Sequence, residues 1–392
     1  MDRRPDHIQL SGGWEGDVYR SWDFPPDVVE SWNSLARAAG DWGVFIGYGW
    51  FEAFWRAFSQ GREPFVVVLK KEGKVKAVFP CCTMTGSGND PQKDPVSSLT
   101  NDHTCHYDFL IEPELRQDAI GCFIELWRRI APDREITCEY MPAFGQNGIS
   151  FVQGLHKARI PVHTDDGPWA PWLKMSGNWD QFWEALPRKR RDNLKRRRKR
   201  AEEKGKLQFE AIRESRRLDE MLDVLFEIES RSWKGKEGTA IQSEPEVDRF
   251  YRRLAHWAMR ENRLVLFLLK LDGRPMAGGY CLSSGGTVFL LKIGRDESFD
   301  AFSPGSLLQA EIIKYLFTRP EISVYNFLGA CNSWKTEWTS QTSDYGRIMA
   351  YPKSLTGWSR YVRRYGWKNF LKRFQVARTI RAWMSREERK AV

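Results

Sequence analysis

The stretch Gly49–Pro80, GWFEAFWRAFSQGREPFVVVLKKEGKVKAVFP, has a second version later in the chain. Laid without a gap over Arg249–Tyr280, RFYRRLAHWAMRENRLVLFLLKLDGRPMAGGY, it keeps an offset of 200 residues throughout. Each version predicts an amphipathic helix, a short polar link, and two strands joined by a turn at Gly73 or Gly273. Convergence is the competing explanation, because a helix followed by a hairpin is a common unit. We favour duplication and therefore expect two copies of one α/β fold.

The sequence around the repeat predicts interleaved helices and strands in both halves. In the first half we expect helices at Pro26–Ala39, Tyr48–Ser59 and Pro113–Ile130, with strands at Phe65–Lys70, Val75–Pro80, His106–Ile111 and Ile136–Met141. In the second half we expect helices at Trp179–Ala185, Lys189–Lys204, Leu218–Ser232, Glu244–Arg260 and Gly305–Phe317, with strands at Leu264–Leu271, Met276–Leu282, Val288–Ile293 and Ser323–Leu328. The predicted class is α/β with mixed sheets, in domains 1–172 and 173–352 followed by a tail at 353–392.

The positive charge is unevenly distributed along the chain. Pro187–Lys206, PRKRRDNLKRRRKRAEEKGK, holds twelve basic and three acidic residues, and 353–390 holds twelve and two. These segments contribute +9 and +10 to a total of +10, so the remainder carries −9. This pattern describes an acidic body with two basic segments and argues against a uniformly basic nucleic-acid binder.

Cysteine use and hydropathy bear on the cellular compartment. The seven cysteines have no CxxC spacing, and Cys81 and Cys82 are neighbours, which argues against a disulfide framework. The opening residues MDRRPDHIQLSGGW lack an apolar export segment, and no run approaches the ~18 apolar residues of a membrane helix. We therefore expect a cytoplasmic protein. Peripheral attachment to the inner face of the membrane is the alternative location.

The segment GTVFLLKIGRDESFDAFSPGSLLQAEIIKYLF (286–317) predicts a strand, a loop and a helix. Ser303 suits the N-cap, Pro304 suits the first turn, and Gly305 lets a ligand approach the backbone. Free N–H groups and the helix dipole there favour a phosphate, although a well-capped helix without a ligand would have the same residues. The next strand ends at Gly329, so we expect a ligand-binding crevice at these strand ends.

Several motifs together carry a resemblance to a known family. SPGSLL (303–308) and YNFLGACNSWKTEW (325–338) resemble segments of the BioF2-like or CelD-type acetyltransferases of the GNAT superfamily. ESRSWKGKEG (229–238) and LPRKRRDNLKRRRKRAEEKGKLQF (186–209) are similar to other segments of that family, and FIGYGWFEAFWRAF (45–58) is similar to its beginning. The resemblance implies a tandem GNAT fold, related to the Fem-type aminoacyl transferases, that moves an acyl group from a thioester to an amine or hydroxyl.

The resemblance also implies a cosubstrate, acetyl-CoA or another acyl-CoA, and no metal. Backbone amides of a bulged central strand at Ile293 would hold the pantetheine arm and polarise the thioester carbonyl. The helix start would take the pyrophosphate, and the implied cofactor-binding residues there are Ser303, Pro304, Gly305 and Ser306, with Asn326 on the next strand.

The sequence departs from the usual GNAT signature at two positions. Asp300 stands where an Arg or Gln is usual, and a carboxylate beside a pyrophosphate is unfavourable, which weakens the case for coenzyme A. Asn326 stands where the family usually has Asp before FL, and an amide cannot act as a base. The general base must therefore come from another position.

Acid and base candidates are spread over both halves. We take Glu229, Tyr325 and Lys335 as the catalytic candidates, with Glu227, Glu337 and Asp108 as further carboxylates. For substrate binding we expect cations and aromatic rings around the crevice. These residues are Arg231, Trp233, Lys234, Gly329, Trp338 and, from the first half, His106. For a single Trp, core packing is the competing role.

The stretch NDHTCHYD (101–108) places two histidines, a cysteine and two aspartates within eight residues. A zinc site is one interpretation, but the spacing matches no standard site and no distant partner pair is visible. We expect His103 and His106 to cap a strand or line the crevice, and we expect no metal.

The two basic segments leave several roles open. Pro187–Lys206 would be a helix charged nearly all round, either solvated or in contact with an anionic substrate or surface. It lacks a known nucleic-acid module and interleaved stacking aromatics, so nucleic acid is not the expected partner. The tail at 353–392 mixes aromatic and basic residues, which suits a helix on anionic lipid or a helix docked on the body.

Together these features predict an acyltransferase that acts on a small-molecule or glycan acceptor, such as a sugar, an amino sugar or an envelope or exopolysaccharide precursor. Two alternatives remain. One is a Fem-like transferase that uses aminoacyl-tRNA. The other is a non-catalytic GNAT-like module that binds polysaccharide or an anionic membrane surface.

Overall fold

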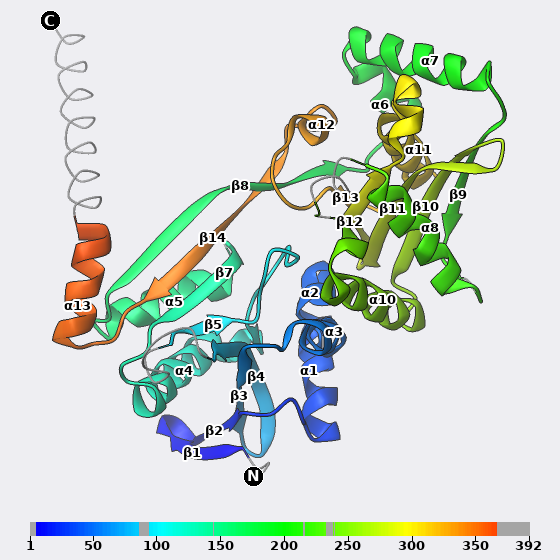
Figure 1. The fold of residues 1–392 in the computed structure, drawn as a ribbon. Coiled ribbons are helices and arrows are strands. Elements are labelled where there is room, and N and C mark those ends of the chain that lie inside the picture. Colours follow the sequence, from blue (N-terminus) through cyan, green and yellow to red (C-terminus); the bar gives the residue numbers. More distant parts are fainter. Residues whose placement is uncertain are drawn as a thin grey trace, which may run out of the picture.

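The computed structural model of the chain describes residues 5–85, 94–143, 145–214, 216–232, 238 and 240–366. Within these ranges, fourteen strands form one continuous sheet, shown in Figure 1. The strand order is β1-β2-β3-β4-β5-β7-β14-β8-β13-β12-β11-β10-β9, with β6 beside β4. The α/β class with mixed sheets predicted from the sequence is confirmed.

The first unit of the fold extends from β1 to α5. Its strands are β1 (Asp6–Leu10), β2 (Trp14–Tyr19), β3 (Arg62–Lys71), β4 (Lys74–Met84), β5 (Val96–Ser98), β6 (Leu110–Ile111) and β7 (Ile136–Pro142). Its helices are α1 (Pro26–Ala38), α2 (Gly43–Ile46), α3 (Tyr48–Phe58), α4 (Arg116–Ile130) and α5 (Gln146–Lys157), with short 3-10 turns η1 (Ser11–Gly13), η2 (Gly40–Trp42) and η4 (Pro113–Leu115).

The second unit extends from α6 to α12. Its strands are β9 (Leu207–Ile212), β10 (Leu264–Leu271), β11 (Arg274–Ser284), β12 (Thr287–Arg295) and β13 (Val324–Asn326). Its helices are α6 (Trp179–Ala185), α7 (Arg188–Glu202), α8 (Leu218–Ser230), α10 (Pro245–Arg260), α11 (Pro304–Phe317) and α12 (Ser333–Thr336), with 3-10 turns η5 (Ile241–Ser243) and η6 (Glu297–Phe302). After it come α13 (Leu355–Tyr361) and η7 (Val362–Gly366).

The two hairpins in the repeated stretches have the same geometry. In β3–β4 and in β10–β11 the pairing shifts by one residue directly after Leu69 and after Leu269. Both turns have positive φ at both positions, 52° and 71° at Glu72–Gly73 and 47° and 77° at Asp272–Gly273. A two-residue hairpin turn of this type follows the natural twist of the strands. Bulge and turn therefore recur at the offset of 200 seen in the sequence, as duplication predicts.

A long two-stranded ribbon joins the two units, and Figure 1 shows it running between them. It consists of β8 (Val162–Lys174) and β14 (Thr342–Ala350). β14 pairs with β7 of the first unit on one side and with β8 on the other. The last three residues of β8, Trp172–Lys174, pair with β13 of the second unit. The boundary predicted at residue 172 falls within this shared strand, and the domain limits stay a prediction.

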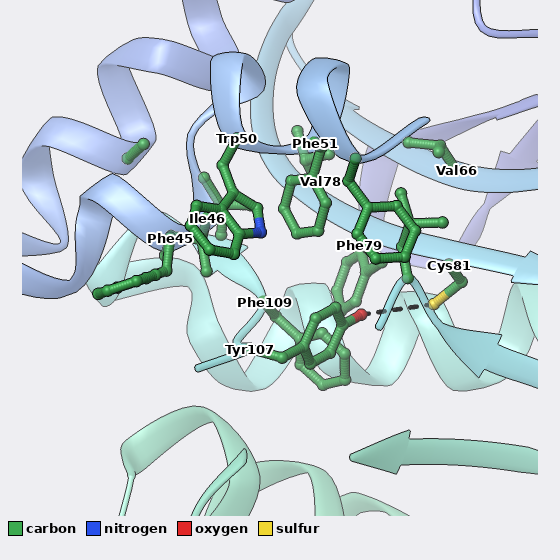
Figure 2. Packing of buried hydrophobic residues seen from close by; sticks show 14 of the residues in the cluster. Phe45, Ile46, Trp50, Phe51, Val66, Val78, Phe79, Cys81, Tyr107 and Phe109 are labelled. Carbon is green, nitrogen blue, oxygen red and sulfur yellow. Dashed lines mark hydrogen bonds between the residues drawn. The ribbon is translucent and has the colours of Figure 1, made fainter. Parts of the chain in front are cut away.

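One apolar core extends through the first unit and into the second. Figure 2 shows its part in the first unit, where Tyr107 and Cys81 contribute a contact of 3.6 Å between the hydroxyl and the thiol. At the contact between the units, the Trp50 ring on α3 packs 5.4 Å from the Phe250 ring on α10. Gly49 allows this approach, because a Cβ there would lie 2.0 Å from the Trp257 indole. The two units are therefore packed as one body.

The strand predicted at His106–Ile111 is mostly wrong. Only Leu110–Ile111 pairs, with Ala77 and Val78 on β4, and the preceding residues form a loop. Tyr107 and Phe109 in this loop are buried in the core of the first unit, next to Phe51 and Phe79, so their apolar character reflects tertiary burial rather than a sheet position.

Candidate active site

β12 and β13 are neighbouring strands that pair over a short stretch and then separate. In the described chain β12 pairs in parallel with β13 only through Thr287–Phe289 and then continues to Arg295 beside β11. Tyr280 on β11 faces Lys292, whereas the next residue, Cys281, faces Leu290. Leu291 is therefore an extra residue on β12, and this β-bulge interrupts the ladder. The bulged central strand expected from the resemblance is present, two residues before Ile293.

Helix α8 lies unusually close to β12. Gly278 and Gly294 face each other on β11 and β12. A Cβ on Gly294 would lie 2.9 Å from the Glu229 Cα, and a Cβ on Gly278 would lie 2.2 Å from a Leu225 methyl. This approach brings the Glu229 side chain to the sheet in a buried position, where its Oε2 accepts a hydrogen bond of 3.0 Å from the Ile241 N–H.

The loop before α11 leaves the head of that helix open. Ser303 has the left-handed backbone at φ 51°, and buried Pro304 starts the helix. The Ser306 N–H donates to the Ser303 carbonyl at 3.0 Å. A Cβ on Gly305 would meet only the Arg295 Cδ, at 3.8 Å. Space in front of the helix start is therefore available to a ligand, where the helix dipole favours an anion.

Asp300, which argued against a phosphate from the sequence, is paired. The Arg295 Nε donates to Asp300 Oδ1 at 2.7 Å, and a second nitrogen of Arg295 lies 3.3 Å from Oδ2. The hydrogen bond that Arg295 donates to Asp300 raises the pKa of the Arg295 guanidinium. The negative charge of Asp300 is thus offset by an adjacent guanidinium, and the objection to a phosphate at Gly305 is weakened.

The first unit has a loop where the second has its bulge. Ser98 on β5 faces Cys81, as Leu290 on β12 faces Cys281. In the first unit, Val78 and Ala77 of β4 face Leu110 and Ile111 of β6. In the second unit, the matching Gly278 and Ala277 of β11 face Gly294 and Arg295 at the end of β12. Three residues (291–293) join these points in the second unit, and eleven (99–109) join them in the first. The stretch NDHTCHYD is thus an expansion at the position of the bulge.

The loop 99–109 extends to the second unit. His103 Nδ1 lies 3.5 Å from the hydroxyl of Tyr251 on α10. The Lys292 ammonium lies 5.1 Å from the centre of the Tyr251 ring. Burial and the nearby Lys292 together lower the pKa of His103 to about 4, against the opposing charges of Asp102 and Glu229. His103 therefore lies within electrostatic reach of both β12 and α8.

Cys105 in the same loop faces the same charges. Burial raises the pKa of its thiol to about 11, although Lys292 and Lys335 act in the opposite direction. At neutral pH the thiol is therefore protonated and is a poor nucleophile.

Lys335 is held in the turn that follows β13. The side chain is 8% exposed, and its ammonium donates to the Leu328 carbonyl. Its Nζ lies 3.3 Å from the Cβ position of Gly329, and 5.3 Å from the centre of the Trp334 ring. Lys335 and Lys292 both lower the pKa of the Cys105 thiol, and Lys292 and Glu229 both act on the pKa of His103, so these three charged groups lie within electrostatic reach of the loop 99–109.

Other predicted residues lie outside this group. Tyr325 is fully buried on the α11 side of the sheet and donates to Gln309 at 3.0 Å. Asn326 is 3% exposed, and its side chain accepts from the Leu328 N–H at 2.9 Å. Ile293 packs against the same core as Tyr325. Tyr325 and Asn326 therefore support the end of β13 through buried hydrogen bonds within the protein.

Arg231 and its neighbours form ion pairs of their own. Arg231 contacts Glu227 at 2.5 Å and Asp296 at 3.3 Å. Burial raises the pKa of Asp296, but hydrogen bonds from Ser298 and Arg231 more than offset it, so the pKa is lowered. Trp233 and Lys234 lie outside the described residues.

His106 and Asp108 make hydrogen bonds with side chains of β14 and α5. His106 Nδ1 lies 2.9 Å from the Tyr345 hydroxyl, and its ring stacks 4.5 Å from the Trp42 ring. Asp108 accepts from Asn147 at 3.1 Å, and burial raises its pKa to about 6.

The basic helix α7 lies beside η6 and α11. Its Leu194 and Ala201 pack into the core of the second unit. Arg190 lies 3.9 Å above the Trp338 ring and pairs with Glu337. Among the described residues, six of its exposed cations have no ion-pair partner, namely Lys189, Lys195, Arg196, Lys199, Arg200 and, just beyond the helix, Lys204. The cationic surface is thus adjacent to the loop that leads into Gly305.

Three further observations bound the site. In the part of the chain that the structure describes, no three potential ligands gather as a metal site requires. A shallow hollow of about 640 Å³ lies on the outer face of α10, where Arg252 pairs with Asp248 and His256 with Asp219. None of the helices within the described ranges is both long and apolar enough to span a membrane. The predicted tail lies outside these ranges beyond residue 366.

Sequence and structure comparisons agree with this geometry. Residues 188–336 match the family model for the acetyltransferase (GNAT) domain. The comparison with curated protein sequences gives no match. Among solved structures, FemX is similar with a TM-score of 0.56 and 12% identity, over 81% of this chain and 95% of that chain. A conserved protein of unknown function from Bacteroides thetaiotaomicron is similar with a TM-score of 0.50 and 10% identity, over 82% and 97%. The segment 188–336 is thus similar to the GNAT acetyltransferase domain, and the overall fold of the chain is similar to that of FemX.

Proposed function

We propose that the protein is an acyltransferase of the BioF2-like or CelD-type group that uses acetyl-CoA or another acyl-CoA as donor. The observation that carries the proposal is the bulge at Leu291 on β12 beside the open helix start at Gly305. Peptide groups released by the bulge would polarise the thioester carbonyl. The amides at the head of α11 would bind the pyrophosphate.

The acceptor in this proposal is an amine or hydroxyl of a sugar or of an envelope or exopolysaccharide precursor. It would bind on the face of β12 that looks toward the first unit, among Lys292, Lys335 and Glu229. Two cations around one crevice favour an acceptor that carries negative charge. Peripheral attachment of the tail to anionic lipid would fit a lipid-linked precursor.

The second candidate is a Fem-like transferase whose donor is aminoacyl-tRNA. The observation that favours it is α7, which places exposed cations without ion-pair partners next to η6 and the head of α11. An RNA backbone at the donor site would meet this surface, and its binding would weaken steeply with salt. The same surface would bind a polysaccharide or membrane in the non-catalytic alternative.

Calorimetric titration of the full chain with acetyl-CoA tests the donor site. We expect binding by the wild type and at least a tenfold weaker Kd for Gly305→Tyr. The added side chain has room to fold, because its Cβ meets only Arg295 at 3.8 Å, but it fills the space in front of α11. Gly121→Tyr is the matched control, since an added Cβ on this exposed α4 residue meets no atom within 4 Å.

Three results separate the alternatives. An unchanged Kd in Gly305→Tyr contradicts the placement of the donor site. No acetyl-CoA binding by the wild type, together with salt-dependent binding of aminoacyl-tRNA, selects the second candidate. Binding of neither donor, with retained binding of polysaccharide or anionic vesicles, selects the non-catalytic module.

A further inference from the structure

We propose that the first unit supplies the general base for acyl transfer in the second unit, and that this base is the imidazole of His103. The inference rests on the proposed acyltransfer function. It assigns the proton acceptor that the second unit lacks at Asn326.

The first step concerns the origin of the loop. At the position where the second unit forms its bulge, the first unit has eleven residues (99–109) in place of three (291–293). The loop ends in β6, which pairs with Ala77 and Val78, so both of its ends are fixed in the sheet. The first unit thus has an anchored loop at the position of the bulge, and His103 in this loop contacts Tyr251 of the second unit, the ring next to the Lys292 ammonium.

The second step concerns how His103 is held. Its backbone N–H donates to the Asn101 side chain at 3.0 Å, and its ring stacks on Phe58 at 5.7 Å. Nδ1 faces the Tyr251 hydroxyl at 3.5 Å. In the described part of the chain, Nε2 has no hydrogen-bond partner. The tautomer with the proton on Nδ1 directs that proton to Tyr251 and leaves the Nε2 lone pair available to a substrate.

The third step concerns the surrounding charges. The groups that act on the imidazole are Lys292 of β12, Glu229 of α8 and Asp102 of the loop itself. Tyr251 of α10 lies against both His103 and Lys292, and its own pKa is raised well above the usual value by burial. Burial is the main cause of the lowered pKa of His103, so the imidazole is neutral at physiological pH, the state in which a base accepts a proton. Glu229 and Asp102 would stabilise the imidazolium once it forms.

The chemical step balances with these residues and an acyl thioester. The amine or hydroxyl of the acceptor attacks the thioester carbonyl carbon while His103 Nε2 takes its proton. The new C–N or C–O bond forms, and the C–S bond breaks. The imidazolium then gives its proton to the departing thiolate, so the base is regenerated and a free thiol leaves.

Thiol release from acetyl-CoA by the full-length protein tests the inference, first with glucosamine 6-phosphate, an amine acceptor that carries negative charge, and then with water alone. We expect His103→Gln to lower the turnover rate about 100-fold to 1,000-fold while the Kd for acetyl-CoA changes less than twofold. Free imidazole should restore part of the turnover to His103→Ala. His156→Gln, the same change at an exposed residue of α5, should have no effect.

A second measurement does not require turnover. Diethyl pyrocarbonate modifies accessible neutral imidazoles, and peptide mass spectrometry gives the rate at each histidine. We expect saturating acetyl-CoA to slow modification of His103 at least tenfold and to leave His156 unchanged.

The measurements distinguish a failure of the His103 proposal from a failure of the acyl-CoA proposal. Acetyl-CoA binding with normal turnover in His103→Gln, or with unprotected His103, overturns the role of His103 and leaves the acyltransfer proposal standing. No acetyl-CoA binding by the wild type overturns the acyl-CoA proposal itself, on which this inference rests.

Discussion

The two units share a hairpin and differ one strand later. Each hairpin has the same bulge and the same turn, and each carries a lysine after the bulge that reaches a carboxylate on the neighbouring strand. Lys70 contacts Asp17 at 2.8 Å, and Lys270 contacts Glu210 at 2.7 Å. Both units thus have the same hairpin and lysine–carboxylate pair, whereas the next strand differs: it is β12 in the second unit and is divided into β5 and β6 in the first.

The divergence involves both backbone and side chains. The second unit has a nine-residue β12 with a bulge and the glycine pair Gly278 and Gly294. At the matching positions the first unit has Val78 and Leu110, which face each other, and the strand is broken into β5 and β6. The second unit therefore lacks side chains where the first unit has Val78 and Leu110, and the first unit has the longer connection.

Replacing Gly294 of β12 with an aliphatic residue, as the first unit has at the matching position, should have the largest effect on stability. Gly294→Val places a Cβ 2.9–3.0 Å from backbone and Cβ atoms of Glu229, so α8 must move away from the sheet. We expect the free energy of unfolding to fall by about 3 kcal/mol, as in overpacked cores. Urea denaturation measures it, with Gly121→Val on exposed α4 as control, expected within 1 kcal/mol of the wild type. Equal stability of Gly294→Val would show that the glycine pair is not required for α8 packing.

The pH dependence of stability should depend on the inserted loop. Burial lowers the pKa of His106 to about 3, below the usual value near 6.5. The unfolded chain therefore binds a proton that the folded chain does not, and stability is lost as the pH falls below 6.5. On the order of 2–3 kcal/mol from His106 should be lost between pH 6.5 and 4.5.

Denaturation at several pH values tests this contribution. His106→Gln should flatten the slope over this range, and His156→Gln should leave it unchanged. A slope for His106→Gln equal to that of the wild type would contradict the assignment. His103, which lies in the same loop, contributes in the same direction.

Removal of the lysine from the Lys70–Asp17 pair and from the Lys270–Glu210 pair should have the smallest effects on the free energy of unfolding, and the two losses should differ. Asp17 is 6% exposed, whereas Glu210 is 40% exposed, so removal of the lysine leaves a more buried carboxylate in the first unit. We expect Lys70→Met to cost about 1–2 kcal/mol and Lys270→Met less than about 1 kcal/mol, since exposed pairs contribute little. His7, 2.7 Å from Asp17, limits the first loss. Chemical denaturation of the two variants compares them, and equal costs would refute the distinction.

The helices and the paired hairpins follow from the sequence because they have strong local signals. The strands of the joining ribbon do not. β8 contains two prolines and consecutive aspartates, Asp165 and Asp166, and it is paired on both sides by segments far away in the sequence. Local propensity carries no information on such pairing.

The helix start at Gly305 could be predicted from the sequence, and the contacts around His103 could not. Ser303, Pro304 and Gly305 form a local motif, so their position at the head of α11 is readable from the sequence. His103, Tyr251 and Lys292 lie on three separate elements of two units. The signal available for His103 was the density of polar groups in 101–108, which suggested chemistry without indicating its partners.

The joining ribbon has a consequence for synthesis of the chain. Val162 at the start of β8 pairs with Ala350, which the ribosome adds 188 residues later. Until β14 emerges, β7 and β8 both present unpaired edges to solvent, a state that favours aggregation and attracts chaperones. Translation speed over the second unit therefore sets how long those edges remain exposed, and truncation before Thr342 would make the exposure permanent.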